Sequence, residues 1–228
     1  MSPLFDRMLQ PSMSIRFQFL FVALLLMLAA PIVLPDPLVD YAIPALFTVL
    51  ALTALATVAE DRRTLTVGLA LALPTIVIHW IAPGGQVSLA GEISGDLFLI
   101  WVTIALLLHV VRSKRVTREV LFAVACVYLL LALIWAMAYG IADGVQPGTL
   151  SVPDVLLGPG DDPSARALYS YFSFVTLTTL GYGDITPVTD AGRLLAMLEA
   201  TLGQLFLVIL VARLVGMHTA QRMARMRE

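Results

Sequence analysis

Long apolar runs separated by short polar connections dominate the chain. A membrane-spanning helix needs about 20 mostly apolar residues, and six segments meet this requirement at least loosely. They are Phe17–Leu34, Tyr41–Ala59, Thr64–Ala82, Leu97–Val111, Val116–Ile141 and Gly192–His218. The fourth is short, and its ends can extend into the flanking polar residues. The pattern predicts an all-α membrane protein with six transmembrane helices.

A seventh apolar run, Ala165–Thr178, has only about 14 residues, which is too short to cross a bilayer and favours a re-entrant helix. Asp162 can cap its start, and Pro163 suits the first helical position. This short helix lies between the fifth and sixth predicted spans.

The composition agrees with a membrane protein, because 59% of the 228 residues are hydrophobic and 13% are charged, with a mean hydropathy of +0.91. Soluble domains carry about a quarter charged residues. The single cysteine, Cys126, excludes an intrachain disulfide and reads as a small buried or lipid-facing residue. No soluble ligand-sensing, nucleotide-binding or redox domain is expected on these residues, no cofactor is predicted, and no nucleic-acid motif is found.

The basic residues predict the orientation, since Lys and Arg gather on the cytoplasmic side of membrane proteins. If the six spans alternate, twelve fall on one side: Arg7, Arg16, Arg62, Arg63, Arg112, Lys114, Arg115, Arg118, Arg213, Arg222, Arg225 and Arg227. Only Arg166 and Arg193 fall on the other side, where many carboxylates collect. We therefore expect both termini in the cytoplasm and the chain in the cell membrane. An alternative reading of the first span is a cleaved signal peptide, which would leave the other spans in the same orientation.

The stretch "TTLGYGD", Thr178 to Asp184, interrupts the apolar pattern with alternating glycines. Gly181 and Gly183 can adopt positive φ without steric cost. Glycine at alternate positions allows the carbonyls of Thr179, Leu180, Gly181 and Tyr182 to face one way. Four such strands around an axis, with the Thr179 hydroxyl at the inner end, would form oxygen cages that replace the hydration shell of a monovalent cation.

This stretch resembles the potassium channel signature T-x-T-T-x-G-Y-G-D, and the resemblance extends over about Pro163 to Val215. It implies a homotetramer in the lipid bilayer that conducts K⁺, with a re-entrant pore helix and a selectivity filter between the fifth and sixth helices. The implied ion-binding residues are Thr179, Leu180, Gly181, Tyr182 and Gly183, with K⁺ held by backbone carbonyls and by Thr179. Thr178, Asp184, Tyr171 and Phe172 would support the filter.

The resemblance also suggests how the filter is braced. Tyr182 would pack on Tyr171, Phe172 and Phe174, and the Tyr171 hydroxyl can reach Asp184 at the outer mouth. Many relatives carry a tryptophan donor at the Phe172 position, and phenylalanine cannot donate. Leu180 replaces the commoner valine or isoleucine, but the site uses only its carbonyl.

Two residues of the last span are gating or cavity candidates. Gly203 falls where relatives carry a gating glycine, although close helix packing would also explain it. Glu199 would face the re-entrant helix with Thr176 or Thr178 as partners, line the cavity, or serve as a structural acid. Gln204 is a weaker cavity candidate, and Gly216 reads as a helix terminator.

Arg112, Arg115 and Arg118 are spaced by three, as in a voltage sensor. A sensor needs such charges inside the membrane field, each worth about 2.3 kcal/mol per 100 mV, and the run before them has no arginine or lysine. We interpret them as cytoplasmic anchors and expect weak voltage dependence. His79 and His109 are interpreted as structural histidines rather than a metal pair, with His109 a possible pH-sensitive element.

The chain therefore divides into a four-helix module without sensor arginines (residues 1–112), a pore domain of outer helix, pore helix, filter and inner helix (residues 113–218), and a short basic tail (residues 219–228). The alternatives are a poorly selective cation channel, a non-conducting accessory subunit and an intramembrane serine protease. A serine protease needs a nucleophile and a base. Ser94 in "GEISG" is the candidate nucleophile, but we expect it in an outer loop with no histidine beside it. The signature favours a channel over an enzyme.

Overall fold

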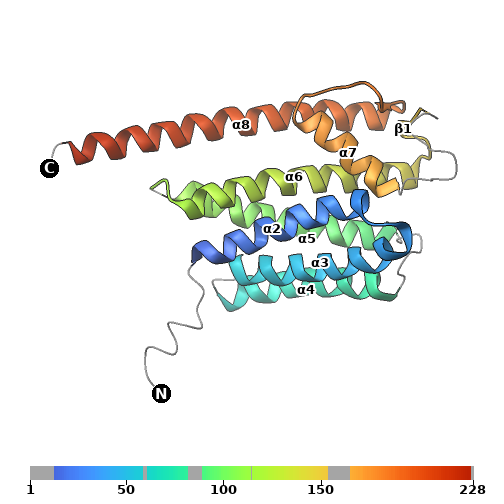
Figure 1. The fold of residues 1–228 in the computed structure, drawn as a ribbon, viewed down its shortest axis with the longest axis horizontal. Coiled ribbons are helices and arrows are strands. Elements are labelled where there is room, and N and C mark those ends of the chain that lie inside the picture. Colours follow the sequence, from blue (N-terminus) through green and yellow to red (C-terminus); the bar gives the residue numbers. More distant parts are fainter. Residues whose placement is uncertain (1–12, 59–60, 82–88, 114, 154–164, 227–228) are drawn as a thin grey trace, which may run out of the picture.

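The computed structural model describes residues 13–58, 61–81, 89–113, 115–153 and 165–226. Its long helices are α2 (Met13–Val33), α3 (Asp36–Val58), α4 (Arg62–Ile81), α5 (Leu89–Arg112), α6 (Arg118–Val145) and α8 (Asp190–Arg225). The short helix α7 (Ala165–Leu177) lies between α6 and α8 (Figure 1). Each predicted apolar segment is thus helical over its described residues, except at the segment ends Leu34, Val116, Thr117 and Thr178, and α5 begins at Leu89 rather than at Leu97. Pro163 and Asp162, the proposed start of the short helix, lie outside the described residues.

Five described helices are long and apolar enough to cross a membrane: α3, α4, α5, α6 and α8. The apolar part of α2, Ile15–Pro31, is shorter than this criterion requires, as is Ala167–Leu177 in α7. The chain is therefore a multi-pass, all-helical membrane protein, while a sixth crossing by α2 stays a prediction. The brevity of α7 agrees with its interpretation as a helix that does not cross.

Helix α2 packs inside the helical assembly, against α3 and α6. Phe17, Leu20 and Leu24 of α2 are almost completely buried in the main hydrophobic core. Cleavage after α2 would expose these side chains and the surfaces of the helices that they cover. The structure describes α2 as part of the packed assembly, and the signal-peptide alternative stays a prediction that it does not test.

Polar side chains cap the N-termini of two helices, α4 and α6, where the sequence changes from polar to apolar. The backbone N–H of Thr64 donates to Asp61 Oδ1 at 2.7 Å before α4, and Thr117 is the N-cap of α6. Such caps satisfy N–H groups that have no partner inside the helix. Both caps lie at the end of the molecule where α8 ends (Figure 1).

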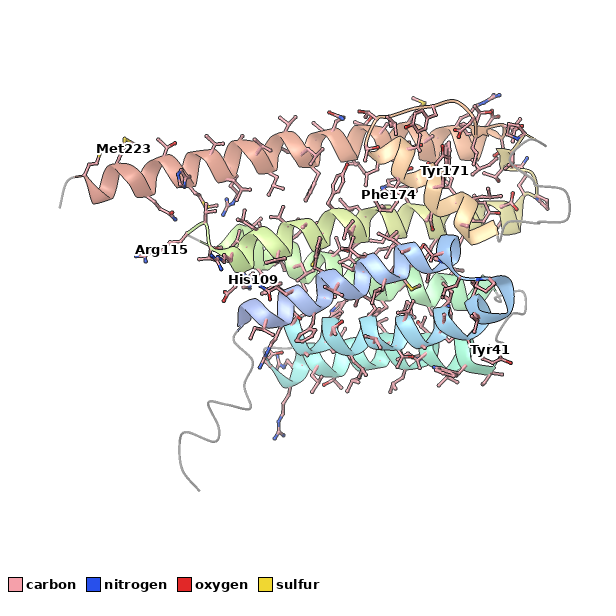
Figure 2. All side chains as sticks on the ribbon, in the orientation of Figure 1. Tyr41, His109, Arg115, Tyr171, Phe174 and Met223 are labelled. Carbon is pink, nitrogen blue, oxygen red and sulfur yellow. The ribbon has the colours of Figure 1, made fainter. Side chains whose placement is uncertain are left out.

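The basic residues near the α5–α6 junction lie outside the membrane-crossing helix interiors. Arg112 is the last residue of α5, Arg118 is the first of α6, and Arg115 lies between them; all three are exposed. Figure 2 shows Arg115 at the same end of the assembly as Met223, away from Tyr171. This position agrees with anchoring at the membrane surface rather than with a row of sensor charges.

Two further features were not predicted from the sequence. A two-stranded antiparallel pair, β1 (Leu150–Ser151) with β2 (Thr186–Pro187), joins the start of the outer loop to the residues after the filter stretch. Helix α8 runs through Gly216 to Arg225, so the prediction that Gly216 ends the helix was wrong, and residues 219–225 of the predicted tail continue it. The helix is about 54 Å long at 1.5 Å per residue.

Candidate functional site

The stretch after α7 has an alternating backbone. Thr179, Gly181 and Gly183 have φ values of +58°, +58° and +76°, in the left-handed region that favours glycine. Thr179 is the one non-glycine residue with positive φ among the described residues. Every second residue from Thr179 to Gly183 therefore has positive φ. Two of these residues are the glycines that the sequence pattern indicates, and the third is Thr179.

The N–H groups of this stretch turn back toward the end of α7. Thr179 N donates to Thr176 O at 3.0 Å, while Leu180 N and Gly181 N donate to Val175 O at 2.9 and 3.2 Å. A trans peptide unit points its N–H and the preceding C=O in opposite directions, and no cis bond occurs among the described residues. The carbonyls directed away from α7 are those of Thr178, Thr179 and Leu180.

The stretch is uncovered on the single chain. Residues 178–183 are all exposed, with Leu180 at 55% and Tyr182 at 67%. Tyr182 does not belong to the cluster that holds Phe172 and Tyr171. The expectation that Tyr182 packs on the α7 aromatics was therefore wrong within one chain, because this ring finds no cover without a neighbouring molecule.

A hydrogen bond braces the outer end of the stretch. The Tyr171 hydroxyl donates to Asp184 Oδ2 at 2.5 Å, and the backbone N–H of Ile185 donates to Asp184 Oδ1 at 3.0 Å. These donors, Tyr171 foremost, hold the pKa of the Asp184 carboxyl below its usual range because they stabilise its charged form. Phe172, which has no donor, is buried and packs edge-on against Tyr139 with ring centroids 4.9 Å apart.

Glu199 is completely buried on α8 and bonds to neither of its predicted threonine partners. Its carboxyl oxygens instead meet the hydroxyls of Ser173 on α7, at 2.5 Å, and Tyr139 on α6, at 2.7 Å. The prediction that Glu199 faces the short helix is correct, but the partner residues were wrong. Its burial also contradicts the alternative in which it lines a water-filled cavity.

Gly203 lies one turn beyond Glu199 and allows α8 to approach the end of α7. A Cβ there would be 2.7 Å from Leu177 Cδ1 and 2.8 Å from the Leu177 carbonyl oxygen. The next residue, Gln204, donates from Nε2 to Thr179 Oγ1 at 3.1 Å. The close-packing explanation of Gly203 thus has a direct structural basis, and its role as a gating hinge stays a prediction.

The inner part of α8 contacts the four-helix module through Arg213. Its Nη2 donates to the carbonyl of Val111, at the end of α5, and to the Ser113 carbonyl at 3.3 Å. These carbonyls lie where a helix has no internal donors left. Arg213, considered only as an orientation signal in the sequence, therefore joins α8 to the α5–α6 connection.

The histidines occupy separate apolar surroundings. His79 stacks on Phe47, donates from Nδ1 to the Thr75 carbonyl at 2.8 Å, and lines a cavity of about 80 Å³ that residues of α6 and α7 also line. Since a carbonyl only accepts, Nδ1 carries the proton. His109 lies against Phe17. These contacts agree with structural roles.

Ser94 lies inside α5, so its predicted position in an outer loop was wrong. Its hydroxyl donates to Gly91 O and accepts from the Thr75 hydroxyl, each at 3.0 Å. Among the described residues it has no histidine partner that could act as a base. This geometry gives no support to a serine protease.

Comparisons with known proteins bear on the same part of the chain. Residues 165–220, which contain α7, the filter stretch and most of α8, match the family described as ion channel. A stretch of 54 residues is 47% identical to the two pore potassium channel c of Oryza sativa subsp. japonica, covering 24% of this chain but 11% of the rice protein.

A second relative, Protein LctB of Bacillus caldotenax, is 29% identical over 126 residues, which make up 55% of this chain and 89% of that protein. The rice protein extends far beyond the matched stretch. Together these similarities support an ion channel of the potassium channel type in a multi-pass membrane protein.

Proposed function

We propose that this chain is the subunit of a homotetrameric potassium-selective channel of the cell membrane. K⁺ would bind in cages formed by the backbone carbonyls of the stretch Thr179–Gly183 and by the Thr179 hydroxyl. The observation that carries the proposal is the alternation of positive φ at Thr179, Gly181 and Gly183, together with N–H groups that donate into α7. Such a backbone directs oxygens away from the supporting helix, toward an axis that other chains would share.

The exposed surface of the single chain supports an assembly. One chain supplies one strand of the cage, and the filter residues lack cover. Large apolar side chains are also exposed along α8, and neighbouring subunits or lipid would cover them: Leu194, Met197, Leu198, Leu202, Leu205, Val208, Ile209, Val211 and Val215. The number four follows from the resemblance to potassium channels. Both termini would lie in the cytoplasm, on the side that carries most arginines.

The end of α7 provides the electrostatics for a cation. The helix ends at Leu177, directly before the filter, so its negative dipole end points at the inner end of the ion path. The exposed arginines near α5 would lie outside the membrane field, and the predicted spans of the four-helix module contain no arginine or lysine that could support strong voltage sensing.

The deciding experiment measures K⁺ and Na⁺ flux in vesicles that contain the purified protein, comparing the wild type with Gly181→Ala. Alanine is strained at φ +58° and should disturb the carbonyl alignment, so selective K⁺ flux should be lost. Gly148→Ala is a matched control, because Gly148 also has positive φ (+83°) and open space around it, but lies outside the filter.

Equal selective flux in Gly181→Ala and in the wild type would contradict the filter assignment. Reversal potentials in mixed K⁺ and Na⁺ separate a selective channel from a poorly selective one. Absence of any flux from a well-assembled wild-type protein would favour the accessory subunit instead.

A further inference from the structure

Glu199 lies where the three helices of the pore domain meet, with none of its surface exposed. Tyr139 of α6 donates to its Oε2 at 2.7 Å, and Ser173 Oγ of α7 lies 2.5 Å from its Oε1. The same Ser173 oxygen lies 2.8 Å from the backbone carbonyl of Ala132 in α6. Four oxygen-bearing groups from three helices thus form one connected chain.

The number of protons needed by this hydrogen-bonded network indicates the protonation state of the Glu199 carboxyl. The Ser173 hydroxyl has one proton but two close partners, the Ala132 carbonyl and Glu199 Oε1, and a carbonyl has no proton to give. If Glu199 were ionised, the single Ser173 proton could serve only one of these two contacts. The other contact would then bring two oxygens together with no proton between them. A neutral Glu199 donates to Ser173, Ser173 donates to Ala132, and Tyr139 donates to Glu199, so every contact has its proton.

The charges around Glu199 lead to the same conclusion. No cation among the described residues forms an ion pair with it, and the nearest arginine along α8, Arg193, pairs with Asp190 at 3.7 Å. The titratable groups that face it are Tyr139 and, farther along α6, Tyr128, while α7 contributes the Ser173 hydroxyl. An unpaired carboxylate inside a membrane is strongly disfavoured.

The contact continues from Glu199 to the filter in steps of one helical turn. Ser173 and Leu177 are four residues apart on α7, and they meet Glu199 and Gly203, which are four residues apart on α8. Residues at this spacing share one helix face. Gln204 then bonds to Thr179. A change in how Ser173 meets Glu199 would therefore move the support of the filter's inner end.

We propose that Glu199 is a neutral carboxylic acid whose proton, donated to Ser173, holds the pore helix between the outer and inner helices. Glu199 is then a positioning residue for the filter, and its effect on conduction rests on the proposed channel function. Ionisation removes the donated proton and places an unpaired charge behind α7. Alkaline pH should therefore loosen the three-helix contact and reduce flux.

The test uses Glu199→Gln in the full-length reconstituted protein. The glutamine carbonyl can accept from Tyr139, and its NH₂ can donate to Ser173, so it imitates the neutral acid and cannot ionise. We expect Glu199→Gln to match the wild type in flux and thermal stability at neutral pH. Toward alkaline pH the wild type should lose both, while Glu199→Gln should retain them. Glu199→Ala, which removes the contact, should lose both at every pH.

Infrared difference spectroscopy between wild type and Glu199→Gln provides a readout independent of conduction. A protonated-carboxyl carbonyl band in the wild type at neutral pH, absent from the variant, supports the proposal. A carboxylate band in its place overturns it, as does a Glu199→Gln variant that loses stability and flux as Glu199→Ala does. A wild type with the protonated band but no K⁺ flux would contradict the channel function and leave the protonation state established.

Discussion

At the residue scale, the Asp184 carboxylate joins the proposed filter stretch to α7. It accepts from the Tyr171 hydroxyl and from the N–H of Ile185. The exposed position of residues 178–183 means that few other contacts within the chain hold this stretch. The two donors explain why the pKa of Asp184 lies below its usual range, since both favour the ionised carboxyl.

This bond predicts how acid affects the outer mouth. A carboxylate with a lowered pKa contributes its stabilisation above the ordinary aspartate range and loses it as the pH falls through the lowered value. Tyr171→Phe removes the largest cause of the lowered pKa. We expect the acid-induced loss of K⁺ flux to begin at a higher external pH in Tyr171→Phe than in the wild type.

The measurement is flux against external pH in reconstituted vesicles. Tyr182→Phe is a suitable control, because this substitution also removes one tyrosine hydroxyl from the same region. Among the described residues, the Tyr182 hydroxyl is not one of the donors to Asp184. An unchanged acid profile in Tyr171→Phe would show that the bond does not support the conducting filter.

At the element scale, the contact between α7 and α8 depends on a missing side chain. Gly203 leaves room for Leu177, whose carbonyl would lie 2.8 Å from an added Cβ. The Tyr128 hydroxyl of α6 donates to the same carbonyl at 3.4 Å. The end of α7 is therefore enclosed by α6 and α8, and α8 cannot accept even a methyl group here without shifting.

Gly203→Ala should therefore destabilise the protein by about 1–3 kcal/mol, the usual cost of overpacking. Gly216→Ala is the matched control on the same helix, because nothing lies within 4 Å of its Cβ position. That change should stabilise the helix by up to about 1 kcal/mol through helix propensity. Thermal unfolding of the purified proteins in one detergent measures both effects.

A Gly203→Ala variant as stable as Gly216→Ala would contradict close packing at this position. A variant that is stable but gates differently would instead favour the hinge interpretation. The two roles of Gly203 are thus separated by stability and open probability.

At the scale of the whole molecule, the helices place basic residues and the filter at opposite ends. Arg115 lies at one end and Tyr171 toward the other (Figure 2), and α2 begins and α8 ends at the end that carries Arg115 (Figures 1 and 2). A membrane around the long helices would separate these ends. The arginine-rich end would then face the cytoplasm.

Cysteine labelling in intact cells tests this orientation. Val145 and Met223 are 72% and 50% exposed; Val145 is the last residue of α6, and Met223 lies in the last turn of α8. A membrane-impermeant maleimide should label Val145→Cys from outside, and Met223→Cys only after permeabilisation. The native Cys126 is buried against α2, so the wild type should stay unlabelled. Labelling of both variants from outside would contradict the proposed topology.

Local signals in the sequence were sufficient for much of the architecture. The apolar runs predicted the helices, since burial in lipid requires length and continuous hydrophobicity. The alternating glycines predicted the positions of positive φ at Gly181 and Gly183, since glycine has no Cβ. The continuation of α8 beyond Gly216 was missed because a single glycine does not stop a helix that other residues favour.

The sequence by itself determined which segments are apolar, where the backbone can adopt alternating φ, and which end carries the arginines, because these properties depend on residue type and local spacing. Only the tertiary structure decided that Glu199 meets Ser173 and Tyr139, that Gly203 receives Leu177, and that Arg213 reaches the end of α5. Such pairings depend on how helices distant in sequence rotate and approach one another, and that geometry has no signature at any single position.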